Sequence, residues 1–139
     1  MSYKAVSLAA SALYITLFAC LLVAPDLIYS FFGIARHATA DLLARRAAML
    51  FLGLAVLCFL GRNAPPSDFR QAVSVAMATT MAGLIIAGMY EFFFGVAGVG
   101  IWAAITGEAL FLGLYLRVLL SDSAHLKGRG AAQVTGRSG

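Results

Sequence analysis

The sequence has few charged residues, two cysteines and three prolines. Charged residues make up 12% of the 139 residues and hydrophobic residues 62%, whereas an ordinary soluble domain has roughly a quarter and roughly half. A soluble fold of this length leaves too much of its chain exposed to hide so much apolar surface. The composition therefore excludes a soluble enzyme, a secreted disulfide scaffold and a disordered protein, and it indicates a membrane protein.

The two cysteines, Cys20 and Cys58, both lie inside apolar stretches. Their spacing matches neither a metal site nor a disulfide framework. Cysteine is also among the residue types most often buried, where it acts as a small hydrophobic side chain. We therefore expect both cysteines to lie in apolar surroundings, and the sequence predicts no metal site and no bound cofactor.

Basic residues outnumber acidic residues by ten to six, which gives a net charge of +4. Binding of nucleic acid would need a clustered basic face interleaved with aromatic residues, and the sequence contains none. In a membrane protein such an excess is read as a signal of orientation. We therefore expect no nucleic-acid partner.

Four apolar segments, separated by polar or helix-breaking residues, have the length of membrane-spanning helices. We expect helices at about residues 3–23, 42–60, 69–94 and 99–120. Short connections between them favour an up-down arrangement. The predicted fold is therefore all-α, an integral membrane antiparallel four-helix bundle. It forms one transmembrane domain over residues 1–120, followed by a polar, glycine-rich tail over residues 121–139 that we expect to be disordered.

The first apolar segment could be mistaken for a signal peptide. Its uncharged stretch is about 21 residues long, which exceeds the roughly 7–15 apolar residues of a signal peptide. We therefore expect a retained helix, followed by a short amphipathic extension over residues 26–33. Asp41 is expected to cap the second span, and Ser67 or Asp68 the third.

The basic residues are distributed unevenly between the two sides of the predicted bundle. One side, with both termini, holds seven of them: Lys4, Arg62, Arg70, Arg117, Lys127, Arg129 and Arg137. The other side holds three: Arg36, Arg45 and Arg46. The positive-inside rule places the richer side in the cytoplasm. We therefore expect a multi-pass protein of the bacterial inner membrane with cytoplasmic N- and C-termini.

Two positions carry charge where lipid is expected. Only about 15 uncharged residues separate Arg46 from Arg62, fewer than the roughly 20 of a comfortable crossing. Glu108 lies about nine residues into the fourth span, which corresponds to a depth of about 13 Å. An ionised carboxylate at that depth is costly unless it is paired or hydrated.

An antiparallel bundle offers partners for Glu108 at a similar depth. These considerations predict one polar cluster of Arg45, Arg46, Glu91 and Glu108 in the outer half of the bundle. Further hydrogen bonds or ring faces are expected from His37, Tyr90, Trp102 and Tyr115. Three interpretations stay open: an ion pair that fixes helix register, a pocket for a small ligand or lipid headgroup, and a path for protons or ions.

Several stretches carry a resemblance to a known kind of protein. They are residues 24–27 with residues 31–33, the stretch from Arg45 to Leu54 that opens the second span, and the pair Gly107-Glu108. Over about residues 13–117 the chain resembles small four-helix bacterial membrane proteins of the DUF4345 and DoxX-like kind. The resemblance implies an integral membrane protein without an agreed reaction. Some DoxX-like proteins act in thiol or sulfur oxidation, but this chain has no CxxC motif, so that activity is not carried over.

The sequence therefore predicts a binding or accessory protein without catalytic activity of its own. Its expected partners are membrane lipids, with other membrane subunits or a hydrophobic small molecule as further candidates. Two alternatives remain: a membrane enzyme that acts on a lipid-soluble substrate through Arg46 and Glu108, and an oligomeric small transporter or channel component.

Overall fold

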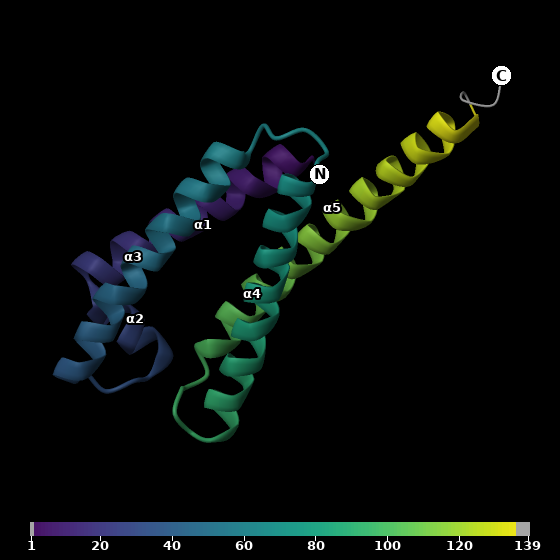
Figure 1. The fold of residues 1–139 in the computed structure, drawn as a ribbon. Helices are drawn as coiled ribbons and strands as arrows, with labels where there is room; N and C mark the ends of the chain where they lie inside the picture. The colour runs from purple at the N-terminus through teal and green to yellow at the C-terminus, as the bar shows by residue number, and fades with distance from the viewer. Residues whose placement is uncertain (1, 136–139) are drawn as a thin grey trace.

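The computed structural model describes the backbone of residues 2–135 and the side chains of residues 2–123, and the end of the tail lies outside this range. Within it the chain forms helices and no strand (Figure 1). The helices are α1 (Tyr3–Val23), α2 (Pro25–Phe32), α3 (Ala38–Gly61), α4 (Asp68–Phe93) and α5 (Ile101–Thr135). The predicted all-α fold class is confirmed.

Four of these helices are long and apolar enough to cross a membrane. The candidate spans are Tyr3–Val23, Ala38–Gly61, Asp68–Phe93 and Ile101–Ser123. They match the four predicted spans in number and order, and the predicted amphipathic extension is helix α2. The architecture is that of a helical, multi-pass membrane protein.

The helix ends differ from the predicted ones where side chains make other contacts. Ser67 caps α4 as predicted, because its hydroxyl accepts a hydrogen bond from the Arg70 amide at 3.4 Å. The predicted cap at Asp41 is wrong: α3 begins at Ala38 with His37 as its N-cap residue. The Asp41 carboxylate instead accepts hydrogen bonds from Arg36, at 3.0 and 3.2 Å.

Helix α5 is longer than the fourth predicted span. It continues to Thr135, whereas the sequence predicted an end near Leu120 and disorder from residue 121. No proline follows Leu120, and proline is the residue that interrupts a helix most strongly. The last turns of α5 therefore extend past the other helix ends (Figure 1).

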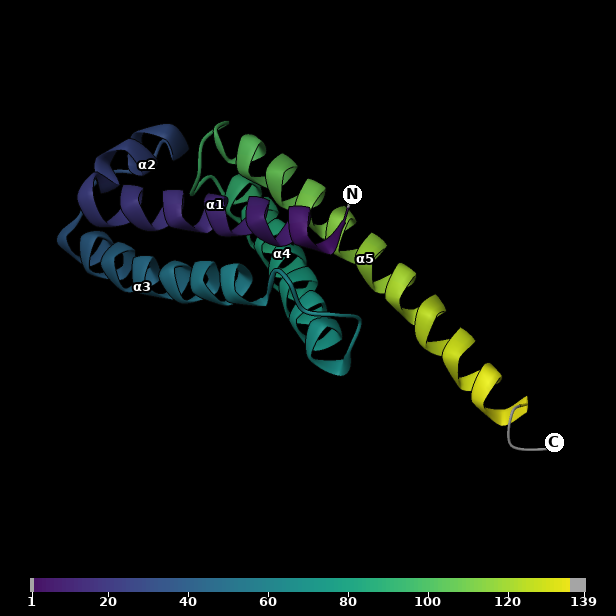
Figure 2. The ribbon, with the colours of Figure 1, turned by 90° about the horizontal axis from the view of Figure 1, so that it is seen from above.

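The long helices form two antiparallel pairs, α1 with α3 and α4 with α5, and most contacts between helices lie within these pairs. The pairs meet where α1 and α4 begin and diverge toward α2 (Figures 1 and 2). We call the end with the start of α1 and the α3–α4 connection the N-terminal end. The opposite end, with α2 and the α4–α5 loop, is the α2 end.

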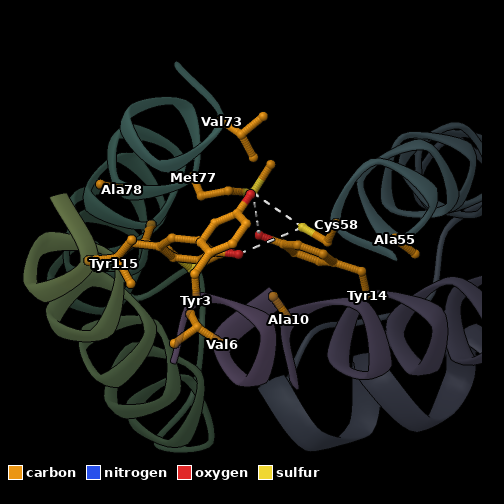
Figure 3. Packing of buried hydrophobic residues seen from close by; sticks show 12 residues of the cluster. Tyr3, Val6, Ala10, Tyr14, Ala55, Cys58, Val73, Met77, Ala78 and Tyr115 are labelled. Carbon is orange, nitrogen blue, oxygen red and sulfur yellow. Dashed lines mark hydrogen bonds between the residues drawn. The ribbon is translucent and has the colours of Figure 1, made fainter. Parts of the chain in front are cut away.

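All four long helices contribute to one buried core toward the N-terminal end (Figure 3). The Tyr14 hydroxyl donates to the Met77 sulfur at 3.5 Å, and the Cys58 sulfur lies 3.7 Å from the Tyr115 hydroxyl and 3.9 Å from the Met77 sulfur. These contacts join one residue from each long helix. This core is therefore closely packed, and Cys58 lies in apolar surroundings as the sequence predicted.

At the α2 end, contact between the pairs runs through backbone. The Gly98 amide donates to the Phe32 carbonyl oxygen at 2.6 Å. A Cβ on Gly100 would overlap the Phe31 carbonyl oxygen, so only glycine allows this approach. Gly33 ends α2 with a φ of 67°, a value that glycine adopts without steric cost. The glycines thus dock the α4–α5 loop onto the end of α2.

Candidate functional site: a cleft between the two helix pairs

A cleft of about 350 Å³ lies between the diverging helix pairs. All five helices contribute to its walls, which are mainly apolar. Typical wall residues are Leu17 of α1, Phe32 of α2, Phe51 of α3, Met81 of α4 and Ala104 of α5. Its size falls within the range of about 300–1,000 Å³ that is typical of small-molecule sites.

Two carboxyl groups, Glu91 and Glu108, interrupt the apolar walls of the cleft. Glu91 belongs to the last turn of α4, and Glu108 is on the third turn of α5, about 10 Å along the helix from Ile101. The Glu108 Oε2 atom is buried and has no hydrogen-bond partner among the described residues. A buried polar atom without a partner is rare in folded proteins. Glu108 is therefore the feature of the cleft that packing alone does not explain.

Close packing of α4 against α5 sets the position of Glu108. A Cβ on Gly88 of α4 would lie 3.1 Å from the Ile105 Cγ1 atom, so the two helices approach closely at this level. Ile105 is buried, and Glu108 follows it by three residues and therefore lies near the same face of α5. A Cβ on Gly107 would meet nothing within 4 Å. The wall next to the carboxyl group is thus left open.

The structure brings Glu91 and Glu108 to one cleft but does not bring the predicted arginines to it. Arg45 and Arg46 are exposed and take part in none of the ion pairs found among residues 2–123. The expected Arg46–Glu108 ion pair is therefore not formed. The position of a residue in the sequence gives its depth along a helix but not its direction around the helix axis.

The direction of Arg45 and Arg46 follows from the neighbouring alanines. Ala44 and Ala48 are buried in a cluster with Leu21 of α1, so this face of α3 packs on α1. Successive residues of a helix are rotated by about 100°. Arg45 and Arg46 consequently point about 100° and about 200° away from the Ala44 direction.

The four additional candidates also lie outside the cleft. His37 is exposed at the start of α3, and Tyr90 is exposed and packs on Phe94 with a distance of 4.3 Å between ring centroids. Trp102 packs edge-on against Phe92, and Tyr115 is fully buried in the core (Figure 3). Their predicted participation in ligand binding has no support in these positions.

Sequence reasoning missed the buried ion pair at the N-terminal end. Arg70 Nη2 donates to Asp122 Oδ1 at 2.8 Å, and Arg70 Nε lies 2.8 Å from Asp122 Oδ2. The guanidinium group also lies over the Tyr3 ring, 4.3 Å from its centroid. The available signal was an arginine at the start of one span and an aspartate at the end of its antiparallel neighbour, because these positions lie at one membrane level.

A second ion-pair cluster lies at the α2 end, outside the cleft. Arg36 contacts Asp26 at 2.8 Å and Asp41 at 3.0 Å. The hydrogen bond with Asp41, followed by the charge of Asp26, raises the pKa of the Arg36 guanidinium. This arginine therefore stays charged and joins the connection before α3 to the start of α2.

The described residues contain no group of three or more His, Cys, Asp or Glu side chains that could hold a metal ion. Both cysteines are free thiols. Comparison with known proteins gives no match to a family model, to a curated protein or to a solved structure. The chemistry of the cleft is that of an apolar lining and two carboxyl groups.

Proposed function

We propose that this protein binds an apolar or amphipathic molecule in the cleft between its two helix pairs, and that it has no catalytic activity of its own. The ligand would place an apolar body against the side chains of α1, α3 and α4. A hydroxyl or amine group on it would donate a hydrogen bond to Glu108 or Glu91. The unpartnered, buried Oε2 atom of Glu108 carries this proposal.

The composition of the cleft supports binding of this kind. Ligand sites are mostly apolar, with a small number of polar groups that fix the orientation of the ligand. The alternative hypothesis is an enzyme that uses Arg46 together with Glu108. It has less support, because Arg46 is exposed and is not among the residues that line the cleft. Binding is therefore the better-supported of the two functions.

Native mass spectrometry of the protein, extracted in a mild detergent, tests this proposal. We expect the wild-type protein to carry a molecule other than bulk phospholipid. The Ala104→Phe variant should lose it, because the phenyl ring would fill the cleft. Ala109→Phe is the matched control, since Ala109 is exposed on the same helix and does not line the cleft.

Three results would count against ligand binding in the cleft. One is a wild-type protein that carries phospholipid alone under all extraction conditions. Another is retention of the molecule by Ala104→Phe, and the last is an equal loss from both variants. Folding of each variant is checked by the thermal unfolding midpoint before the spectra are compared.

We also propose that the protein lies in the bacterial inner membrane with its N-terminal end toward the cytoplasm. The distribution of Lys and Arg between the two ends supports this orientation. In a variant without native cysteines, a membrane-impermeant maleimide should label Thr39→Cys in intact spheroplasts and Lys4→Cys only after permeabilisation. The reverse pattern would overturn the orientation without affecting the proposed cleft.

A further inference from the structure

A second cavity, of about 510 Å³, lies at the N-terminal end, on the far side of the buried core from the cleft. It is bounded by the start of α1, the α3–α4 connection, the first turn of α4 and the α5 segment from Arg117 to Ser121. These segments are the adjoining ends of all four candidate spans. The cavity therefore lies at the level of one membrane surface.

The walls of this cavity are strongly basic. Four cationic side chains line it: Lys4, Arg62, Arg70 and Arg117. None of the described residues that line it carries a carboxyl group. Asp122, just outside the lining, pairs with Arg70. Lys4, Arg62 and Arg117 have no carboxylate partner among the residues that the structure describes.

Backbone donors add to these cations. The Tyr3 ring lines the cavity and packs against the Arg70 guanidinium, while its hydroxyl is buried near Gly61. Ser2 and Tyr3 also place the amino-terminal end of α1 at the cavity wall, and the free amide groups of a helix start favour anions.

Basic residues at the opposite end of the molecule are arranged differently, because Arg45 and Arg46, unpaired among the described residues, are exposed there and line neither this cavity nor the cleft. Arg36 at the α2 end contacts two carboxylates, those of Asp26 and Asp41. At the N-terminal end, cations surround a cavity and most lack such partners. The positive-inside rule accounts for the presence of basic residues on one side, but it does not require them to converge on one cavity.

We propose that the N-terminal cavity binds a phosphate group, and that the phosphate belongs to the headgroup of an anionic membrane phospholipid. Basic pockets between transmembrane helices are sites of this kind. Arg70, fixed by Asp122, forms the rigid wall, while Lys4, Arg62 and Arg117 supply the charge that attracts the phosphate. This site is separate from the proposed ligand cleft and does not depend on it.

The test compares lipid binding by two variants that each lose two positive charges. Lys4→Gln/Arg117→Gln removes two cations from the cavity, and both side chains are exposed, so the fold should be retained. Arg45→Gln/Arg46→Gln removes two exposed cations at the α2 end. Native mass spectrometry gives the Kd of each protein for phosphatidylglycerol, for phosphatidylcholine and for inorganic phosphate.

We expect wild-type protein to prefer phosphatidylglycerol over phosphatidylcholine. Each lost cavity cation should weaken phosphatidylglycerol binding by about fivefold, and both together by about thirtyfold. The α2-end variant should bind like the wild type. Competition by inorganic phosphate in the same concentration range as the lipid would support a phosphate site but assign it to a soluble source.

Equally weakened phosphatidylglycerol binding in both double variants would overturn the proposal, because the affinity would then depend only on the overall charge of the protein. Equal affinity of the wild type for the two phospholipids, together with no binding of inorganic phosphate, would overturn it as well. If Lys4→Gln/Arg117→Gln does not fold, the single variant Arg62→Gln replaces it, with Arg45→Gln as its matched control.

Discussion

Two carboxyl groups on α5, the buried Asp122 and the half-buried Glu108, have opposite surroundings. Asp122 lies at the N-terminal end, where both of its oxygens face Arg70 at 2.8 Å and its side chain is 3% exposed. Glu108 lies at the cleft, where its Oε2 atom is buried without a partner among the described residues. Both are acidic residues on α5, yet only one has a counter-charge supplied by the fold.

This difference separates a charge that the fold neutralises from one that it leaves without a partner in the described part of the chain. A buried ion pair holds two elements in register, and removal of one partner is costly. An unpartnered polar atom at a cleft contributes no such contact. The N-terminal end thus joins the helix pairs through side chains, whereas at the α2 end the pairs meet through the docked α4–α5 loop and leave the cleft between them.

The comparison predicts its largest effect for Asp122. We expect Asp122→Ala to lower the free energy of unfolding by about 3 kcal/mol, because it leaves the partly buried Arg70 charge without its carboxylate partner. The measurement is reversible unfolding in mixed micelles. The double variant Arg70→Met/Asp122→Leu should recover most of the loss, whereas equal instability of the single and double variants would show that packing, and not charge, is responsible.

The next effect concerns the glycine contact at the α2 end. Gly100→Ala should lower the free energy of unfolding by about 2 kcal/mol, because its Cβ would overlap the Phe31 carbonyl oxygen and strain the docked loop. Gly113→Ala in α5 is the matched control, since a Cβ there meets nothing within 4 Å. Similar unfolding curves for the two variants would contradict the close docking of the loop onto α2.

A smaller effect is expected where α4 and α5 approach. Gly88→Ala places a Cβ 3.1 Å from the Ile105 Cγ1 atom, and we expect a loss of about 1 kcal/mol. The same substitution in an Ile105→Ala background should cost less, because the opposing atoms are gone. A double-mutant cycle measures this coupling, and additive effects would exclude it.

The smallest change in stability is expected for Glu108. Glu108→Gln should shift the free energy of unfolding by less than about 0.5 kcal/mol, because no contact within the protein is lost. It should nevertheless reduce retention of the cleft ligand. The variant for comparison is Asp122→Asn. If Glu108→Gln lost as much stability as Asp122→Asn, both carboxyl groups would have a structural role.

Much of the fold followed from the sequence alone. Four long apolar segments and the residues between them predicted the number and order of the long helices and the extension that forms α2. This works because a segment that crosses a membrane as a helix satisfies its backbone hydrogen bonds within itself. Ser67 also acted as the predicted cap. The start of α3 and the end of α5 differed from the prediction, because α3 begins before Asp41 with His37 as its N-cap residue and α5 continues to Thr135.

The site was predicted less completely. Glu91 and Glu108 were singled out because charge is costly in lipid, and both line the cleft. Arg45 and Arg46 were chosen by the same argument, but they are exposed. Whether any of these residues binds a ligand stays a prediction. Depth along a helix can be counted from a sequence, whereas the face that points to a neighbour depends on which helices pack together.

The sequence by itself determined that this is a membrane protein, that its fold is all-α and how many spans it has, because these properties depend on composition and on local backbone hydrogen bonding. Only the tertiary structure decided that the two pairs diverge around a cleft and that Arg70 neutralises Asp122. It also decided that Glu108 keeps an unpartnered oxygen. Pairing of side chains across helices depends on the packing angle and rotation of whole helices, and these are set by contacts between residues far apart in the chain.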